Sequence, residues 1–140
     1  MNKSIYLICR KHFNAAHRLH NPNYSPEKNL EIFGLCNSKN GHGHNYILEV
    51  YIKGEVEPET GFVMNLVELK SIVEKEIILE CDHKHLNHDV EWLKDINPTA
   101  ENLAVAFWER LVNQFHKEVK LHKIRLYETE NNIVEYKGGE

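Results

Sequence analysis

The feature that most constrains the fold is an alternating run, HNYILEVYIKGEV, at residues 44–56. Tyr46, Leu48, Val50 and Ile52 recur at every second position, with polar side chains such as Asn45, Glu49 and Lys53 between them. Because successive side chains of a strand point to opposite faces, this pattern predicts a strand with one buried face and one exposed face. The chain is therefore built on at least one half-buried sheet.

Two other regions predict further strands. Residues 4–16 begin with the β-rich run SIYLICRKHF, which favours a first strand. Residues 120–138 form two β-runs around Glu130-Asn131-Asn132, a pattern typical of a hairpin. Between the first two strands, residues 19–41 are rich in Asn, Pro and Gly and predict a long loop, which in a compact domain is usually functional or disordered.

Two amphipathic helices are predicted between the strands. One runs from Leu66 to about Leu79 behind the capping residue Asn65, and the other covers about 100–117 behind Thr99. The order is strand, loop, strand, helix, loop, helix, hairpin, with neighbouring strands antiparallel, which indicates an α+β fold. Four strands leave two open sheet edges, so we expect edge-to-edge assembly.

Bulk properties exclude several classes of protein. A chain of 140 residues is expected to form a single domain over residues 1–140. Its net charge of −4 argues against a general affinity for nucleic acid or anionic membranes. No apolar run reaches the length of a signal-peptide core or a membrane span. Three scattered cysteines argue against a disulfide framework and for a reducing cytoplasm.

Histidines suggest a metal site. His42 and His44 lie two residues apart at the entry to a strand, so their rings share a face, and Gly43 between them allows close backbone approach. If the first two strands pair, His17 at the end of the first strand lies opposite them, with His20 as the rival third ligand. Three histidines with a fourth position open are the pattern of a catalytic zinc site; solvent-facing histidines are the alternative.

Cys36, six residues before His42, has three interpretations. It could close the zinc site as a fourth ligand, lie buried as an inert thiol, or act as a reactive thiolate beside a base. Asp82-His83 is a candidate base, since an aspartate can orient a histidine that deprotonates a thiol. Glu128, at the end of a strand, could accept two N–H donors from a planar heterocycle or be a solvated glutamate.

Six motifs in order resemble the 6-pyruvoyl tetrahydropterin synthase family over nearly the whole chain. They are FNAAHRLH, NLEIFGLCNSKNGHGHNY, GEVEPETGFVMNLVELK, CDHKHLNHD, PTAENLAVAFW and YETENNIVEYKG. Two features resemble the pyruvoyl branch of the family more than the related 6-carboxytetrahydropterin synthases. They are the six-residue spacing between Cys36 and the HGH motif, and the ETENN stretch. The resemblance implies the tunnelling fold, a four-stranded antiparallel sheet with two helices on one face. It also implies sheets joined into barrels and a homohexamer made of two trimers.

The resemblance also implies site residues. His17, His42 and His44 match the zinc ligands, and Cys36 matches a catalytic cysteine that transfers protons and is not a ligand. The pair Asp82–His83 matches residues that activate this cysteine from a neighbouring subunit.

Other matches concern the pterin. Glu128 matches the pterin anchor, and Thr99 and Glu101 match residues near the pterin pocket. Three positions depart from the family pattern, namely Ala100, Cys81 and His85. The basic residues that hold the triphosphate have no clear match, and those close to His17 in sequence are Arg10, Lys11 and Arg18.

The activity implied is a zinc-dependent lyase reaction that converts 7,8-dihydroneopterin triphosphate to 6-pyruvoyl tetrahydropterin with loss of triphosphate. Its rival within the family is 6-carboxytetrahydropterin synthase of the queuosine pathway, which cleaves the side chain of the same substrate. A rival from another class is a zinc-stabilised pterin-binding protein without catalysis, in which Cys36 and Asp82–His83 would be dispensable.

Overall fold

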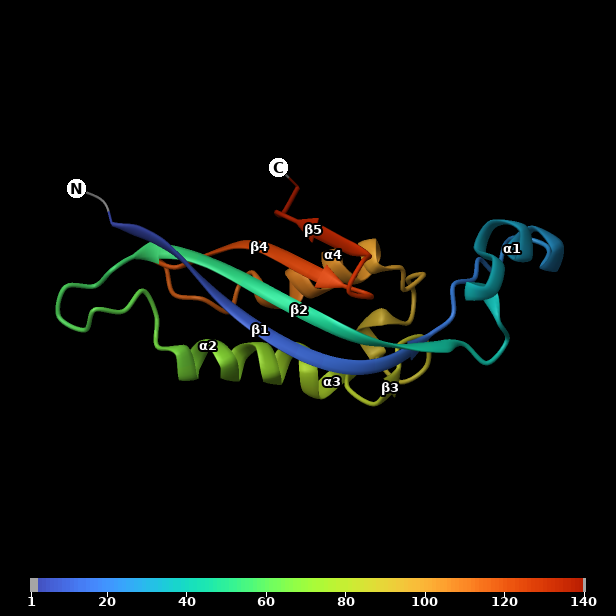
Figure 1. Cartoon of the computed structure of the whole chain (residues 1–140), viewed down its shortest axis with the longest axis horizontal. Helices are drawn as coiled ribbons and strands as arrows, with labels where there is room; N and C mark the ends of the chain where they lie inside the picture. The colour runs from blue at the N-terminus through green and yellow to red at the C-terminus, as the bar shows by residue number, and fades with distance from the viewer. Residues whose placement is uncertain (1–2, 140) are drawn as a thin grey trace.

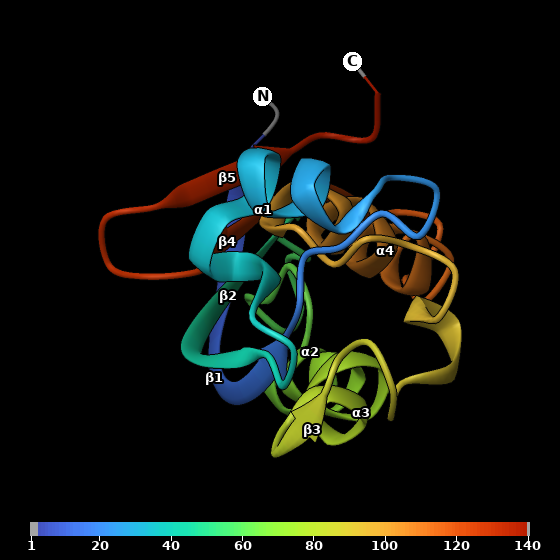
Figure 2. The same cartoon turned by 90° about the vertical axis from the view of Figure 1, so that its right-hand side faces the viewer.

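A computed structural model describes residues 3–139 of the chain, which form one five-stranded sheet with helices on one face (Figures 1 and 2). The strand order is β3-β1-β2-β4-β5. The strands are β1 (Ser4–His17), β2 (His42–Glu55), β3 (Lys84–His85), β4 (Lys120–Tyr127) and β5 (Ile133–Tyr136). β1, β2, β4 and β5 are therefore the four strands predicted from the sequence. The boundaries of β1 and β2 lie within two residues of those predicted.

The long antiparallel pair β1–β2 positions the residues at the end of the sheet. Its register runs from Ser4 opposite Glu55 to His17 opposite His42. β4 pairs antiparallel with β2, and β5 with β4. Because the ladder is unbroken to its last residue, the side chain of His17 is fixed beside those of the β2 entry.

The helices are α1 (Pro26–Phe33), α2 (Leu66–Val73), α3 (Leu79–Cys81) and α4 (Ala100–Leu111). α2 begins as predicted, because the Asn65 side chain accepts a hydrogen bond from the Val67 N–H. Likewise Thr99 caps α4 through the Asn102 N–H. A π-helical segment, Glu74–Ile78, joins α2 to α3.

The core lies between the sheet and α2 to α4, which cover the same face in Figure 2. Tyr46, Leu48, Val50 and Ile52 of β2 are all fully buried, as the alternation predicts. Leu103, Phe107 and Leu111 of α4 and Leu69, Val73 and Ile77 of the α2 region meet them. Leu66, the first residue of the predicted amphipathic helix, is 47% exposed because it lies in the first turn of α2 at the end of the layer.

The structure corrects four expectations. The segment 19–41 is not all loop, since it holds α1 and a 3₁₀ turn, Gly34–Asn37. The sheet has a fifth strand, β3, which pairs parallel with β1, so not all neighbours are antiparallel. The helix predicted at 66–79 contains a π-helical segment and runs on to Cys81. α4 ends at Leu111, before the predicted 117.

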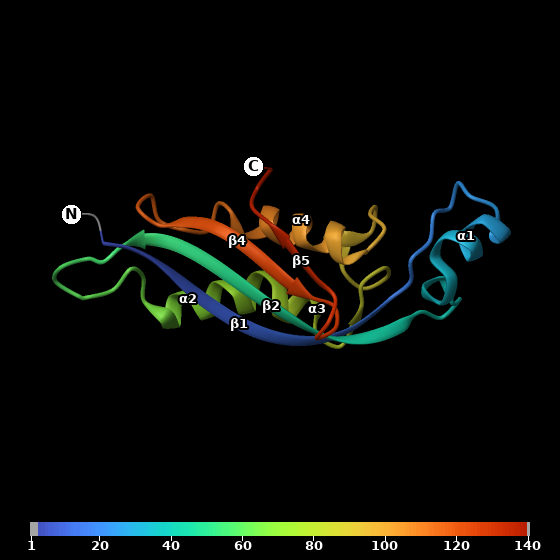
Figure 3. The same cartoon turned by 45° about the horizontal axis from the view of Figure 1, so that its top comes forward.

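α1 projects beyond the end of the sheet, at the right in Figures 1 and 3. Ser25 caps it and Pro26 occupies its first turn. Its Asn29 is buried, with the side-chain amide donating to the carbonyls of Asn21, Tyr24 and Ser25. Polar contacts, not an apolar stripe, therefore hold this helix in place.

Two further observations bear on the expected class. No helix within residues 3–139 combines the length and apolarity needed to cross a membrane. Cys9, Cys36 and Cys81 are all free thiols, with Cys9 and Cys81 buried.

Candidate metal centre and adjoining pocket

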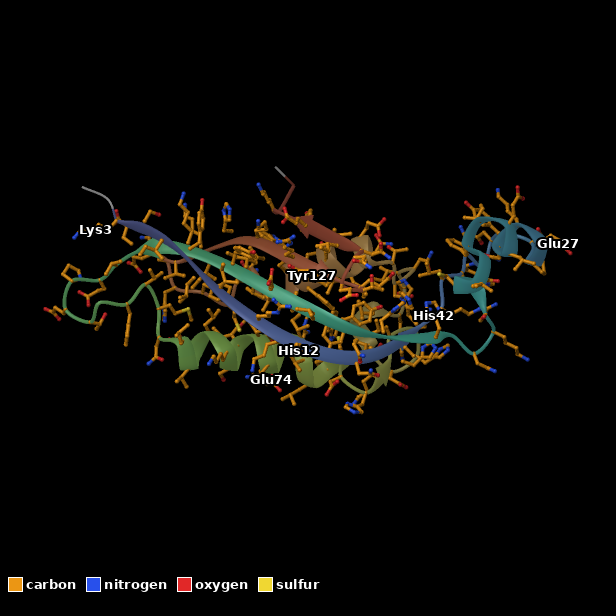
Figure 4. All side chains as sticks on the ribbon, viewed as in Figure 1. Lys3, His12, Glu27, His42, Glu74 and Tyr127 are labelled. Carbon is orange, nitrogen blue, oxygen red and sulfur yellow. The ribbon has the colours of Figure 1, made fainter. Side chains whose placement is uncertain are left out.

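The sheet end brings the three predicted histidines together. His17 is the last residue of β1, and His42 and His44 are the first and third residues of β2. One ring nitrogen from each lies within 4.8 Å of the other two, and Nε2 of His17 is 3.2 Å from Nε2 of His42. Figure 4 shows His42 at the end of the sheet toward which α1 projects.

His17 is held in one orientation from behind. Its Nδ1 lies 2.8 Å from the Pro98 carbonyl oxygen, so Nδ1–H donates and Nε2 keeps its lone pair toward the other histidines. The Tyr46 hydroxyl lies 3.3 Å from the same Nδ1. Burial lowers the pKa of His17 to about 4, although the hydrogen bond to Pro98 acts in the opposite direction. The ring is therefore neutral near pH 7, as a metal ligand must be.

The donor set fits zinc. Two nitrogens bound to one tetrahedral zinc at its usual bond length lie about 3.3 Å apart, close to the His17–His42 contact. Among the described residues, Nε2 of His44 is buried without a hydrogen-bond partner, as expected of a nitrogen that serves a metal. Burial also lowers the pKa of His44. The rival His20 is outside this group, since its Nδ1 lies 2.9 Å from the Asn37 side-chain amide.

Glu128 lies against the histidines. It follows β4, and its backbone N–H donates to the Asn132 carbonyl at 3.0 Å across the hairpin turn. One carboxylate oxygen is 3.9 Å from Nε2 of His17, and the other is 4.0 Å from Nε2 of His44. The hairpin thus delivers a carboxylate to the edge of the metal site.

An open pocket of about 560 Å³ begins at the same carboxylate. It brings together the three residues predicted to lie near a pterin, Glu128, Thr99 and Glu101. Apolar side chains and amide side chains form its walls, and they come from α1, the N-terminus of α4 and the β4–β5 hairpin. The remaining lining residues are Leu19, Ile32, Phe33, Ala100, Asn131, Asn132, Ile133 and Val134. Among residues 3–139, the lining holds two carboxylates and no basic side chain, so on its own it favours a donor-rich, uncharged ring over a phosphate.

Cys36 lies in the 3₁₀ turn Gly34–Asn37 and is partly exposed. Its carbonyl accepts a hydrogen bond from the Leu19 N–H at 2.9 Å, which ties the turn to the chain just beyond His17. Burial, and secondarily the charge of Glu128, raises the pKa of Tyr46. The hydrogen bond to Leu19 places the backbone of Cys36 beside the chain two residues beyond His17.

Asp82 and His83 form a pair elsewhere, on the outer edge of β1. Oδ2 of Asp82 lies 2.9 Å from Nδ1 of His83, and Oδ1 accepts from the Asn14 N–H at 2.8 Å. This backbone hydrogen bond, followed by contact with His83, lowers the pKa of Asp82. His83 has φ +61° and a side chain that is 83% exposed. The pair is assembled but exposed to solvent, and neither residue belongs to the histidine group of the described chain.

Other residues fall differently from the sequence-based expectations. Arg10 contacts Glu49 at 3.5 Å and Lys11 contacts Glu74 at 3.4 Å, so neither lines the pocket. The Arg18 guanidinium donates to the Asn37 carbonyl at 3.0 Å and lines a second hollow. Among the departures from the family pattern, Ala100 lines the pocket, Cys81 is buried in the core, and His85 stacks on His88.

Sequence reasoning missed the groups that support His17, namely Tyr46 and the Pro98 carbonyl. The signal for Tyr46 was present, because it stands two residues after His44 on the same strand face. A backbone carbonyl carries no sequence signal. The apolar wall from Ile32 and Phe33 was missed because α1 itself was not predicted.

Comparison with known proteins identifies the family of this chain. A family model described as 6-pyruvoyl tetrahydropterin synthase matches residues 6–139. This chain belongs to that family. A 6-pyruvoyl tetrahydrobiopterin synthase of Homo sapiens is 48% identical over 126 residues, covering 90% of this chain and 86% of the relative. One from Drosophila melanogaster is 43% identical over 133 residues, covering 95% of this chain and 79% of the relative.

A solved structure extends the likeness to the fold. The 6-pyruvoyl tetrahydropterin synthase of Caenorhabditis elegans superposes with a TM-score of 0.91 at 38% identity, covering 99% of both chains. The predicted family and its α+β tunnelling fold are thereby confirmed. Assembly of 6-pyruvoyl tetrahydropterin synthase subunits into barrels stays a prediction for this chain.

Proposed function

We propose that this chain converts 7,8-dihydroneopterin triphosphate to 6-pyruvoyl tetrahydropterin and releases triphosphate. The reaction needs no outside electrons, because the side chain is oxidised while the ring is reduced. The observation that carries the proposal is the position of Glu128, which lines the pocket and also lies within 4.0 Å of two histidines of the triad. A ring anchored at Glu128 would therefore lie beside the triad, within reach of its side chain.

The pocket would hold the pterin ring. Ionised Glu128 accepts two N–H donors of a planar heterocycle, and such charge-assisted, bidentate bonds fix both position and orientation. Thr99 and Glu101 line the same pocket at the N-terminus of α4. Fixing the ring brings the reacting carbon within reach of the catalytic groups, which lowers the entropic part of the barrier.

His17, His42 and His44 would hold a zinc ion. Zinc bound there supplies Lewis acidity toward the side-chain hydroxyls and makes the adjacent C–H more acidic. Cys36, as a thiolate, takes the carbon-bound proton and returns it during the tautomerisation. The thiol would act as a proton carrier in this scheme and would not be one of the residues that hold the metal.

The pair Asp82–His83 would serve the cysteine of a neighbouring copy. The imidazole is 83% exposed, and the left-handed backbone at His83 is unusual for a non-glycine residue, a cost that is typical of functional sites. A homohexamer made of two trimers would bring this edge to another subunit's Cys36. The three free thiols support a reducing compartment, which we take to be the cytoplasm.

The test is anaerobic turnover of dihydroneopterin triphosphate by zinc-loaded protein, with product masses read directly. We expect a tetrahydropterin that keeps all three side-chain carbons, together with triphosphate. A carboxylated pterin with acetaldehyde would assign the chain to the 6-carboxytetrahydropterin synthases. No turnover by a zinc-loaded, assembled protein would favour the pterin-binding alternative.

Cys36→Ala tests the role of the thiol in the same assay. We expect it to retain zinc and pterin binding and to lose at least about 100-fold in turnover, the scale of a general base. Lys39→Ala, an exposed substitution in the same loop, is the matched control and should keep full rate. Full rate in Cys36→Ala would show that another group takes the proton.

A further inference from the structure

We propose that Glu128 has a second role, as the carboxylate that balances the charge of the metal centre and strengthens its hold on a divalent cation before any pterin binds. The inference rests on the metal centre of the proposed function. It goes beyond anchoring of the heterocycle, because it assigns Glu128 a function in the protein without substrate.

The orientation of the carboxylate is the first argument. An anchor for a ring needs its oxygens toward the pocket alone, yet both oxygens of Glu128 also approach histidine nitrogens, at 3.9 Å and 4.0 Å. These distances fall within the 4.8 Å span of the triad itself. The nitrogen at 4.0 Å belongs to His44, and among the described residues it is buried with no hydrogen-bond partner.

The backbone keeps Glu128 in place. Its N–H is bonded to the Asn132 carbonyl at the mouth of the β4–β5 hairpin, and its side chain is 22% exposed. The backbone of Glu128 is thus fixed beside the site by the hairpin, and its carboxylate lies against His17 and His44 with no ring bound. About four lone-pair sites on a carboxylate leave room for contacts with both the cation side and the ring.

Charge balance is the second argument. Three neutral imidazoles bring no negative charge to a dication, and His17 is fully buried. An uncompensated charge in such a place is unfavourable, and a bound cation is the largest local charge in its site. Within the part of the chain that the structure describes, Glu128 is the carboxylate in ion-pair range of the triad. Glu101 shares the pocket but has no such contact with these histidines.

Zinc titration of metal-free protein, without pterin, tests the inference. Affinity is measured against a competing chelator for the wild type, Glu128→Gln and the control Glu101→Gln. We expect Glu128→Gln to bind zinc about 10- to 100-fold more weakly, the usual effect of removing a group that supports a metal site. Glu101→Gln should match the wild type. Equal affinity in Glu128→Gln and wild type would overturn the inference.

Glu128→Asp keeps the negative charge and guards against misinterpreting a fold defect. It should retain most of the affinity that Glu128→Gln loses, with circular dichroism confirming that both variants are folded. A visible spectrum of the Co²⁺ form adds a direct readout, because the bands should shift in Glu128→Gln and not in Glu101→Gln. Loss of affinity in Glu128→Asp equal to that in Glu128→Gln would mean that charge is not the cause.

The titration also separates this inference from the proposed function. It involves neither substrate nor turnover, so an inactive protein that binds zinc through Glu128 still supports it. If the wild type binds no zinc, both the metal centre and the role of Glu128 are wrong. If all variants bind zinc alike, only the second role of Glu128 is wrong.

Discussion

The histidine triad and the Asp82–His83 pair are both clusters of titratable groups, but they differ in where they lie. The triad includes the buried His17, whereas the His83 side chain is exposed. The triad is assembled by the β1–β2 ladder and completed behind His17 by a backbone carbonyl, so one chain supplies all of it. The pair is fixed just as firmly, through Asn14, yet it lies at the sheet edge with its imidazole exposed.

Under the proposed function, this difference would correspond to two different roles for the two clusters. A metal centre needs several ligands placed within a few tenths of an ångström, and an unbroken ladder within one chain provides that. An acid–base pair needs only an accessible imidazole in the right orientation, so it can serve a site on a neighbouring copy of the chain. The contrast predicts that damage to the triad acts within one chain, whereas damage to the pair acts between chains.

Removal of a triad ligand should have the largest effect. His42→Ala is expected to lower zinc affinity by more than about 100-fold, since loss of a supporting group alone costs 10- to 100-fold. Turnover should fall with it. Metal content after dialysis and the rate at saturating zinc are the measurements. His20→Ala, the former rival ligand, should keep stoichiometric zinc, and loss of zinc there would mean that the ligand set is wrong.

Mixing inactive variants tests the other half of the contrast. Cys36→Ala and His83→Ala should each be inactive alone and regain about one quarter of wild-type activity when co-assembled, because random assembly leaves that share of sites intact. A mixture of Cys36→Ala with His17→Ala should stay inactive, since the thiol and the triad belong to one chain. If the mixture of Cys36→Ala and His83→Ala regains no activity, the pair and the cysteine act within the same subunit.

The smallest effect concerns acid stability at the pair. Because the folded-state pKa of Asp82 is lowered, its stabilisation is present above the ordinary carboxyl range and is lost as pH falls through the lowered pKa. Asp82→Asn keeps an oxygen for the Asn14 N–H but removes this component. Urea unfolding at about pH 7 and about pH 2.5 should show a smaller acid loss in the variant, by at most about 1 kcal/mol for so exposed a group. If acidification lowers the free energy of unfolding equally in both proteins, the lowered pKa of Asp82 does not contribute to stability.

The parts of the fold that sequence predicts are those set by short-range pattern. Period-two alternation in β2 gives both its existence and its buried face, because a sheet has only two faces. The same rule puts His42 and His44 on one face, and strand pairing puts His17 beside them. Capping by Asn65 and Thr99 fixes where two helices begin.

The parts that sequence does not predict depend on distant partners. α1 has no core-facing stripe, and only the Ser25–Pro26 start signature marks it; its anchor is the buried amide of Asn29. His83 has a left-handed backbone and donates its N–H to the Asn14 carbonyl of β1, a partner distant in sequence that no local pattern reveals. Strand β3, of two residues, is too short to leave a periodic signal.

The charge of the pocket has a consequence for how a two-ended molecule enters it. Glu101 and Glu128 are the charged residues of the lining, and no basic side chain offsets them. A lining of acceptors attracts a donor-rich ring and offers no favourable contact to a phosphate. For a substrate that carries a ring at one end and phosphates at the other, as in the proposed function, this pocket would therefore select the ring end. The orientation of such a substrate would be set by the pocket lining, before the reacting side chain meets the triad.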